Sequence, residues 1–172
     1  MKATGSLKRG LARIRRAWLA RKFDVAFAQA DNLLKEWPDN PHLLVLWADL
    51  VQLLDTQEGP TLADAKAAYQ RAAELDKESP EALIGLGHFL YAIEDDAKAA
   101  SDCFAKAITL CRDWLRQTLK GKAEALSEIG RHQEAFECLA EAHWLAQREG
   151  KETDGPPRKE IIERSQMHRT AK

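Results

Sequence analysis

One spacing of small and large side chains recurs along the chain and limits its fold more than any other feature. A small residue is followed four positions later by a large apolar residue, and three positions after that by alanine. The clear copies are Ala65-Tyr69-Ala72, Ala100-Phe104-Ala107 and Ala135-Leu139-Ala142, and a weaker one is Ala26-Ala30-Leu33. Residues at i, i+4 and i+7 lie on one face of an α-helix. The clear copies begin at residues 65, 100 and 135, so the chain is predicted to repeat a helical unit every 35 residues.

A period of this length corresponds to one helix-turn-helix unit, and such units bury their apolar faces only by stacking on one another. Alanine and leucine dominate the sequence, with Lys, Arg, Glu and Gln around them. These side chains lose little rotamer freedom in a helix. Runs rich in valine, isoleucine and threonine, which are typical of strands, are absent. We therefore expect an all-α array of hairpins without a sheet.

The starts of two predicted helices also repeat. Asn40-Pro41 and Ser79-Pro80 each place a capping residue before a proline. Proline suits the first turn of a helix, because the N–H that it lacks needs no partner there. Each start leads to a large–small pair, Trp47-Ala48 in the first helix and Leu86-Gly87 in the second.

With these pairs, the turn glycine Gly130 and the closing proline Pro38, the chain resembles the tetratricopeptide repeat (TPR) family over roughly residues 10–148. The resemblance implies an all-α fold, a right-handed superhelical α-solenoid of about four helix-turn-helix, TPR-like hairpins. The sequence departs from the family pattern at residues 55–61, which lengthen one turn. It departs again at Lys122-Ala123, which stand where a large–small pair is expected.

The helices are predicted near residues 7–21, 24–36, 41–54, 61–75, 80–93, 96–111, 114–129 and 132–147. The TPR-like domain is predicted to cover residues 1–148, with a basic first helix within residues 1–22. Residues 149–172 are predicted to form a linker followed by a short C-terminal helix, near residues 158–168, or a tail.

The net charge of −1 conceals a strong asymmetry. Residues 1–22 contain eight lysines and arginines and no acidic residue, so they carry +8 and the rest of the chain carries −9. Three interpretations stay open for this basic helix: a solvated face of the first hairpin, a contact for nucleic acid or an acidic protein, and a helix lying on a membrane surface. The candidate contact residues are Arg9, Arg13, Arg15 and Arg16.

No motif points to catalysis, a cofactor or a metal. The five histidines are scattered, the three cysteines include no close pair, and no glycine-rich phosphate loop, zinc-binding helix motif or nucleophile elbow occurs. We therefore predict that the protein is not an enzyme and needs no cofactor. No apolar stretch approaches the roughly 20 residues that span a bilayer. The opening residues do not form a signal-peptide pattern, and the cysteines suit a reducing compartment, so a cytoplasmic protein is expected.

In the TPR family the first helix of each hairpin lines a concave face. The positions that the resemblance places there are Val45, Asp49, Gln52, Ile84, His88, Tyr91, Lys120 and Glu124. Acidic residues stand where some TPR modules hold a C-terminal carboxylate with basic ones, so a basic or amphipathic segment of a protein partner is favoured. The predicted function is a non-catalytic protein-binding adaptor, scaffold or regulatory subunit. The alternatives are a nucleic-acid-associated protein acting through residues 1–22 and a structural subunit of a larger complex.

Overall fold

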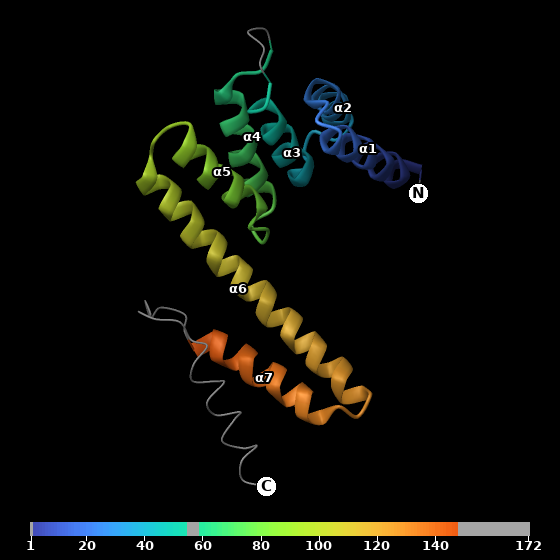
Figure 1. Ribbon diagram of the computed structural model, residues 1–172, viewed down its shortest axis with the longest axis vertical. Helices are drawn as coiled ribbons and strands as arrows, with labels where there is room; N and C mark the ends of the chain where they lie inside the picture. The colour runs from blue at the N-terminus through green and yellow to red at the C-terminus, as the bar shows by residue number, and fades with distance from the viewer. Residues whose placement is uncertain (1, 55–58, 148–172) are drawn as a thin grey trace. The chain divides into compact units, whose positions relative to one another are not determined.

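The fold is all-α, as predicted. The computed structural model describes residues 2–54 and 59–147, and in these ranges it contains seven helices and no strand. Their bounds are α1 Lys2–Leu19, α2 Phe23–Glu36, α3 Pro41–Val51, α4 Leu62–Leu75, α5 Glu81–Ala92, α6 Ala97–Glu128 and α7 His132–Gln147 (Figure 1). The predicted C-terminal helix near residues 158–168 lies outside the described residues, as does the predicted domain boundary at residue 148.

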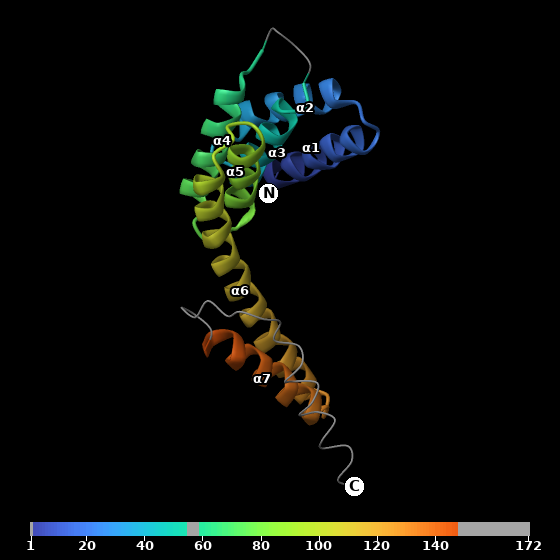
Figure 2. The ribbon, with the colours of Figure 1, turned by 60° about the vertical axis from the view of Figure 1, so that its left-hand side comes forward.

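The described residues form two compact units, 2–115 and 116–147. In the first unit, α1 packs on α2, α3 packs on α4, and each hairpin contacts the following one through α2 with α3 and α4 with α5. Helix α3 also contacts α5, the first helix of the next hairpin. Both views of the structure show α3, α4 and α5 side by side (Figures 1 and 2). Stacking of consecutive hairpins in this order is the packing of an α-solenoid.

The repeated spacing identifies the packing face correctly in the first unit. Every alanine of the copies that begin at Ala26, Ala65 and Ala100 is buried. The central residue of the second copy, Tyr69, is also buried, against Phe89 of α5. Alanine on this face lets neighbouring helices approach closely, and the ring of Tyr69 fills the space beside it.

Helix α6 corrects the predicted map. Two helices were expected, over residues 96–111 and 114–129, but one helix of 32 residues runs through both ranges. Residues 111–115 contain neither glycine nor proline, so nothing in the local sequence stops the helix once it has formed. The third and fourth hairpins therefore share α6, which begins in the first unit and ends in the second.

The second unit is a hairpin formed by the end of α6 and α7. Its core contains Leu119, Ala123 and Leu126 from α6 and Ala135, Cys138 and Ala142 from α7. The turn between the helices contains Gly130, whose φ of 78° lies in the left-handed region that favours glycine. The third copy of the repeat is confirmed in its two alanines but not in Leu139, which is exposed, because Cys138 takes the buried position.

Candidate protein-binding groove

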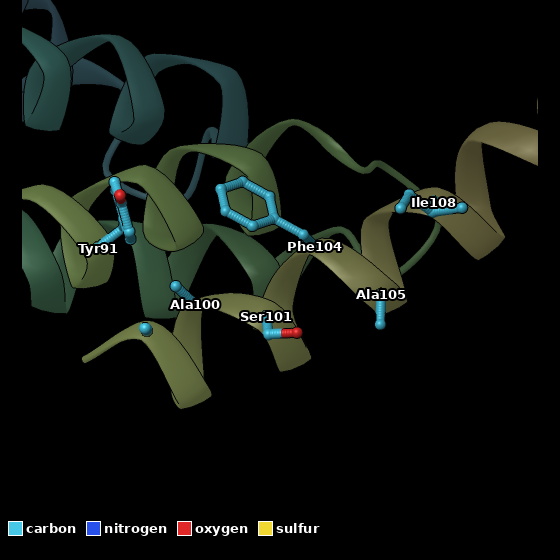
Figure 3. A pocket seen from close by; sticks show the side chains of 7 residues that line it. Tyr91, Ala100, Ser101, Phe104, Ala105 and Ile108 are labelled. Carbon is cyan, nitrogen blue, oxygen red and sulfur yellow. The ribbon is translucent and has the colours of Figure 1, made fainter.

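An apolar groove of about 380 Å³ lies on the first unit, between the end of α5 and the first half of α6. Figure 3 shows Phe104 of α6 near the middle of the groove, between Tyr91 of α5 and Ile108 of α6. The remaining lining residues are small and come from α6: Ala97, Ala100, Ser101 and Ala105. Tyr91 is 63% exposed and Ile108 is 49% exposed, so two large side chains border the groove while open to solvent.

The local sequence explains the shape of the groove. Its lining residues on α6 recur at three- and four-residue intervals, so they form one stripe along the helix. Small side chains on this stripe leave a hollow beside the ring of Phe104. That ring contacts His88 edge-on, with ring centroids 5.1 Å apart. A β-carbon at position 87 would lie 2.7 Å from Cε1 of Phe104, so Gly87 gives the ring its place.

Acidic side chains precede α6 at the end of the groove next to Ala97. The carboxylate of Asp96 accepts a hydrogen bond from the Ala99 amide at 2.9 Å, which caps the helix. Glu94 pairs with Lys66 of α4 at 2.7 Å. Asp95 is exposed and has a φ of 53°, in the region that asparagine and aspartate tolerate best among residues other than glycine. The groove itself is therefore apolar, and of the three carboxylates that precede it in the chain, those of Asp95 and Asp96 form no ion pair within the described residues.

The three concave-face positions predicted on α5 share one exposed side of that helix. Ile84, His88 and Tyr91 are all exposed and follow one another at helical spacing. Tyr91 lines the groove, and His88 contacts it through Phe104. Phe104 and Ile108 themselves were not predicted as contact residues. The three- and four-residue spacing of apolar positions from 97 to 108 is the signal in the sequence that could have identified them.

The contact positions predicted on and just after α3 are less exposed to solvent than those on α5. Val45 is only 5% exposed and packs in the core, so its assignment to a contact surface is corrected. Asp49 and Gln52 are half-buried. Tyr69 of α4 donates a hydrogen bond to the Asp49 carboxylate, and the Gln52 side-chain amide donates one to the Tyr69 hydroxyl at 2.7 Å. These polar groups are engaged with one another across two helices.

Burial changes the acid–base properties of this polar network. Loss of solvent raises the pKa of the Asp49 carboxyl, although the hydrogen bond from Tyr69 opposes the change. Burial and the neighbouring Asp49 carboxylate raise the pKa of the Tyr69 hydroxyl, which stays protonated and acts as a donor. The network thus links α3 to α4.

Lys120 and Glu124, the predicted positions on the second unit, are exposed on the last part of α6. The basic candidates Arg9, Arg13, Arg15 and Arg16 are exposed on α1 of the first unit.

No cluster of three or more His, Cys, Asp or Glu side chains in the described residues is placed to hold a metal ion. Burial raises the pKa of the Cys103 thiol, which disfavours the reactive thiolate. Among the same residues, no helix combines the length and the apolar character that a membrane crossing requires.

No family model matches the chain, and no curated protein matches its sequence. Two similar solved structures carry the descriptions "Crystal structure of MamA protein" and "Crystal structure of MamA". The first is 20% identical with a TM-score of 0.50, over 82% of this chain and 73% of that chain. The second is 22% identical with a TM-score of 0.47, over 76% of this chain and 72% of that chain. MamA is an all-helical, TPR-like solenoid, and the likeness to the first of these structures supports the same fold for this chain.

Proposed function

We propose that this protein is a non-catalytic interaction module that binds an amphipathic segment of a protein partner in the groove between α5 and α6. The observation that carries the proposal is the apolar surface that the exposed Tyr91 and Ile108 form with the partly buried Phe104 around a hollow of about 380 Å³. Aromatic side chains beside a hollow are typical of the central contacts of protein interfaces, where few residues supply most of the binding energy.

The shape of the groove favours a helical segment as its occupant. One wall is a straight helix whose lining positions run from Ala97 to Ile108. An amphipathic helix can lay the residues of its apolar face, spaced at i, i+3, i+4 and i+7, along such a wall. The small side chains of Ala100, Ser101 and Ala105 leave room for its larger ones.

The charge around the groove favours a basic segment. Residues 81–110 contain five acidic residues and two lysines, so this hairpin carries −3. Three of the acidic residues, Glu94, Asp95 and Asp96, directly precede the lining residue Ala97 in the chain, and Lys66 neutralises Glu94. A partner with lysine or arginine beside its apolar face would gain in association rate and in selectivity. A role as adaptor, scaffold or regulatory subunit and a cytoplasmic location stay predictions from the sequence.

A designed peptide tests the groove directly. The probe is a labelled helix of about 18 residues with leucine at i, i+3, i+4 and i+7 and lysine elsewhere, and its binding to the full chain is followed by fluorescence anisotropy. We expect Ile108→Asp to weaken binding about tenfold or more, or about 1.4 kcal/mol. The matched control is Leu139→Asp, because Ile108 and Leu139 are both 49% exposed and both changes add one negative charge. Of these two residues, only Ile108 lines the groove.

Two results would contradict the proposal. Equal loss of binding in the two variants would show that the peptide does not bind in the groove. Equal binding of a peptide with glutamate in place of lysine would remove the preference for a basic partner. If Ile108→Asp alone weakens binding, the natural partner is sought among proteins that the unchanged chain and Leu139→Asp capture but Ile108→Asp does not.

A further inference from the structure

The solvent-facing side of α1 carries five basic side chains. Lys8, Arg9, Arg13, Arg15 and Arg16 are all exposed, and α1 contains no acidic residue. Arg9, Arg13 and Arg16 are spaced by four and three residues, so they form one row along the helix, and Lys8 and Arg15, seven residues apart, form a second row. We call these five residues the α1 basic face.

The opposite side of α1 is already occupied by the core of the first unit. Ile14 is 0% exposed, and Leu7, Leu11 and Trp18 pack against the same cluster. Gly10 is buried so close to α2 that a β-carbon there would lie 2.7 Å from Cδ2 of Leu33. A helix that lies on a membrane inserts its apolar side among the lipids. α1 could do so only by leaving this core, which argues against the membrane-surface interpretation.

Among the residues that the structure describes, the cations of the α1 basic face have no acidic partner. Other exposed cations have acidic partners, such as Lys35 with Asp31 at 2.8 Å and Arg71 with Asp39 at 2.5 Å. Across residues 2–54 and 59–147, no acidic side chain lies within ion-pair distance of the five residues of the basic face. Arg9 donates one hydrogen bond, from Nε to the Gly5 carbonyl at 3.0 Å, which leaves its terminal nitrogens available.

We propose that the α1 basic face binds the phosphate backbone of a nucleic-acid duplex. From Arg9 to Arg16 the helix advances by about 10 Å. Over the same axial length one strand of a duplex presents about three phosphates. Arginine matches phosphate oxygens with paired N–H groups, so a row of three can contact successive phosphates.

The composition of the α1 basic face favours a duplex over a protein partner and over a single-stranded nucleic acid. A protein interface has an apolar centre with charge at its rim, whereas the α1 basic face consists of five cationic side chains. Single strands are held by stacking bases on exposed aromatic rings. At the C-terminal end of α1, Trp18 is half-buried, and so is Phe23 at the start of α2. Their rings contact each other edge-on, with centroids 6.1 Å apart. A backbone contact with a duplex requires neither feature.

The experiment measures binding of the full chain to a random-sequence DNA duplex of about 24 base pairs across a salt series. Three to five phosphate contacts predict a slope of log K against log salt between about −2.7 and −4.5. Changing Arg9, Arg13 and Arg16 together to Gln should reduce the slope by about 2.7 and weaken binding at least tenfold at low salt. The same three positions changed to Lys should keep most of the slope, because the charges remain.

A matched control removes three exposed cations elsewhere by changing Lys77, Lys106 and Lys122 to Gln. It alters net charge equally and should leave the slope nearly unchanged. The proposal is overturned if both Gln variants lose the same affinity or if neither does. It is also overturned if vesicles of acidic lipid, polyglutamate or a single-stranded oligonucleotide bind as tightly as the duplex. Ile108→Asp should not affect duplex binding, so the outcome is independent of the groove.

Discussion

The phenolic hydroxyl of Tyr69 on α4 donates a hydrogen bond to the carboxylate of Asp49 on α3, and it accepts one from Gln52, which directly follows α3. The contact joins the two helices of the second hairpin through groups that are largely removed from solvent. Tyr69 is therefore both the large residue of the repeated spacing and the donor for a half-buried acid. The repeated spacing predicts the first property, and only the structure shows the second.

Changing Tyr69 to Phe should destabilise the first unit by about 1.5–3 kcal/mol, because a half-buried carboxylate loses its donor. Urea unfolding followed by tryptophan fluorescence measures this loss. Tyr91→Phe removes the same hydroxyl from an exposed ring and should stay within about 0.5 kcal/mol of the unchanged protein. Similar losses in the two variants would mean that the Asp49 contact contributes nothing to stability.

Asp49 should also give the protein a measurable pH dependence. Its folded-state pKa is raised by burial, so the folded state binds a proton more tightly than the unfolded state does. Stability is then favoured below the ordinary aspartate pKa of about 4 and declines as pH rises through the raised value. In Asp49→Asn the side-chain oxygen can still accept from Tyr69, but there is no charge to form.

The free energy of unfolding of Asp49→Asn minus that of the unchanged protein should therefore increase between about pH 4 and the raised pKa, and be level on either side. Urea midpoints measured from acid to neutral pH test this expectation. All other carboxyl groups are present in both proteins, so the difference isolates Asp49. A difference that shrinks as pH rises would show that the hydrogen bond from Tyr69 outweighs burial.

Gly85 gives the ring of Tyr69 its space. A β-carbon at this position would clash with Cε1 of Tyr69, so Gly85→Ala should destabilise the first unit by about 1–3 kcal/mol through overcrowding. Gly121 is the control, because it lies within a helix and has open space around the same point. Gly121→Ala should stabilise α6 by about 1 kcal/mol. Hydrogen exchange read by mass spectrometry reports on the two regions separately, and stabilisation by both changes would contradict the role given to Gly85.

The sequence predicts best what depends on the helical period. Ala65, Ala72, Ala100 and Ala107 are buried as their spacing predicts, because helical geometry fixes which residues share a face. The TPR resemblance places Ile84, His88 and Tyr91 on a contact face, and all three are exposed on α5. The TPR resemblance adds the stacking of the hairpins, which the first unit shows through its helix contacts.

Two features could not be read from the period. The break predicted near residue 112 came from extending the repeat, but residues 111–115 contain no helix breaker and α6 continues. A new hairpin that began near residue 112 would pack, in a stacked array, on the face of α6 that contains Phe104 and Ile108. The predicted break therefore implies that these two residues are in the interior of the array. Asp49 was placed on a surface because its partner, the Tyr69 hydroxyl, is on a different helix.

The prediction that Asn40 caps the start of α3 can be tested quantitatively. Its side-chain oxygen accepts a hydrogen bond from the Leu43 amide at 2.9 Å, and Pro41 follows as the first residue of α3. Because α3 contacts α2, α4 and α5, fraying at its start affects three neighbouring helices. Asn40→Ala should cost about 1 kcal/mol in urea unfolding, whereas Asn40→Gly should cost only a few tenths, because glycine tolerates the capping position. If both changes cost the same small amount, Pro41 alone would suffice to start the helix, and the side-chain cap would be dispensable.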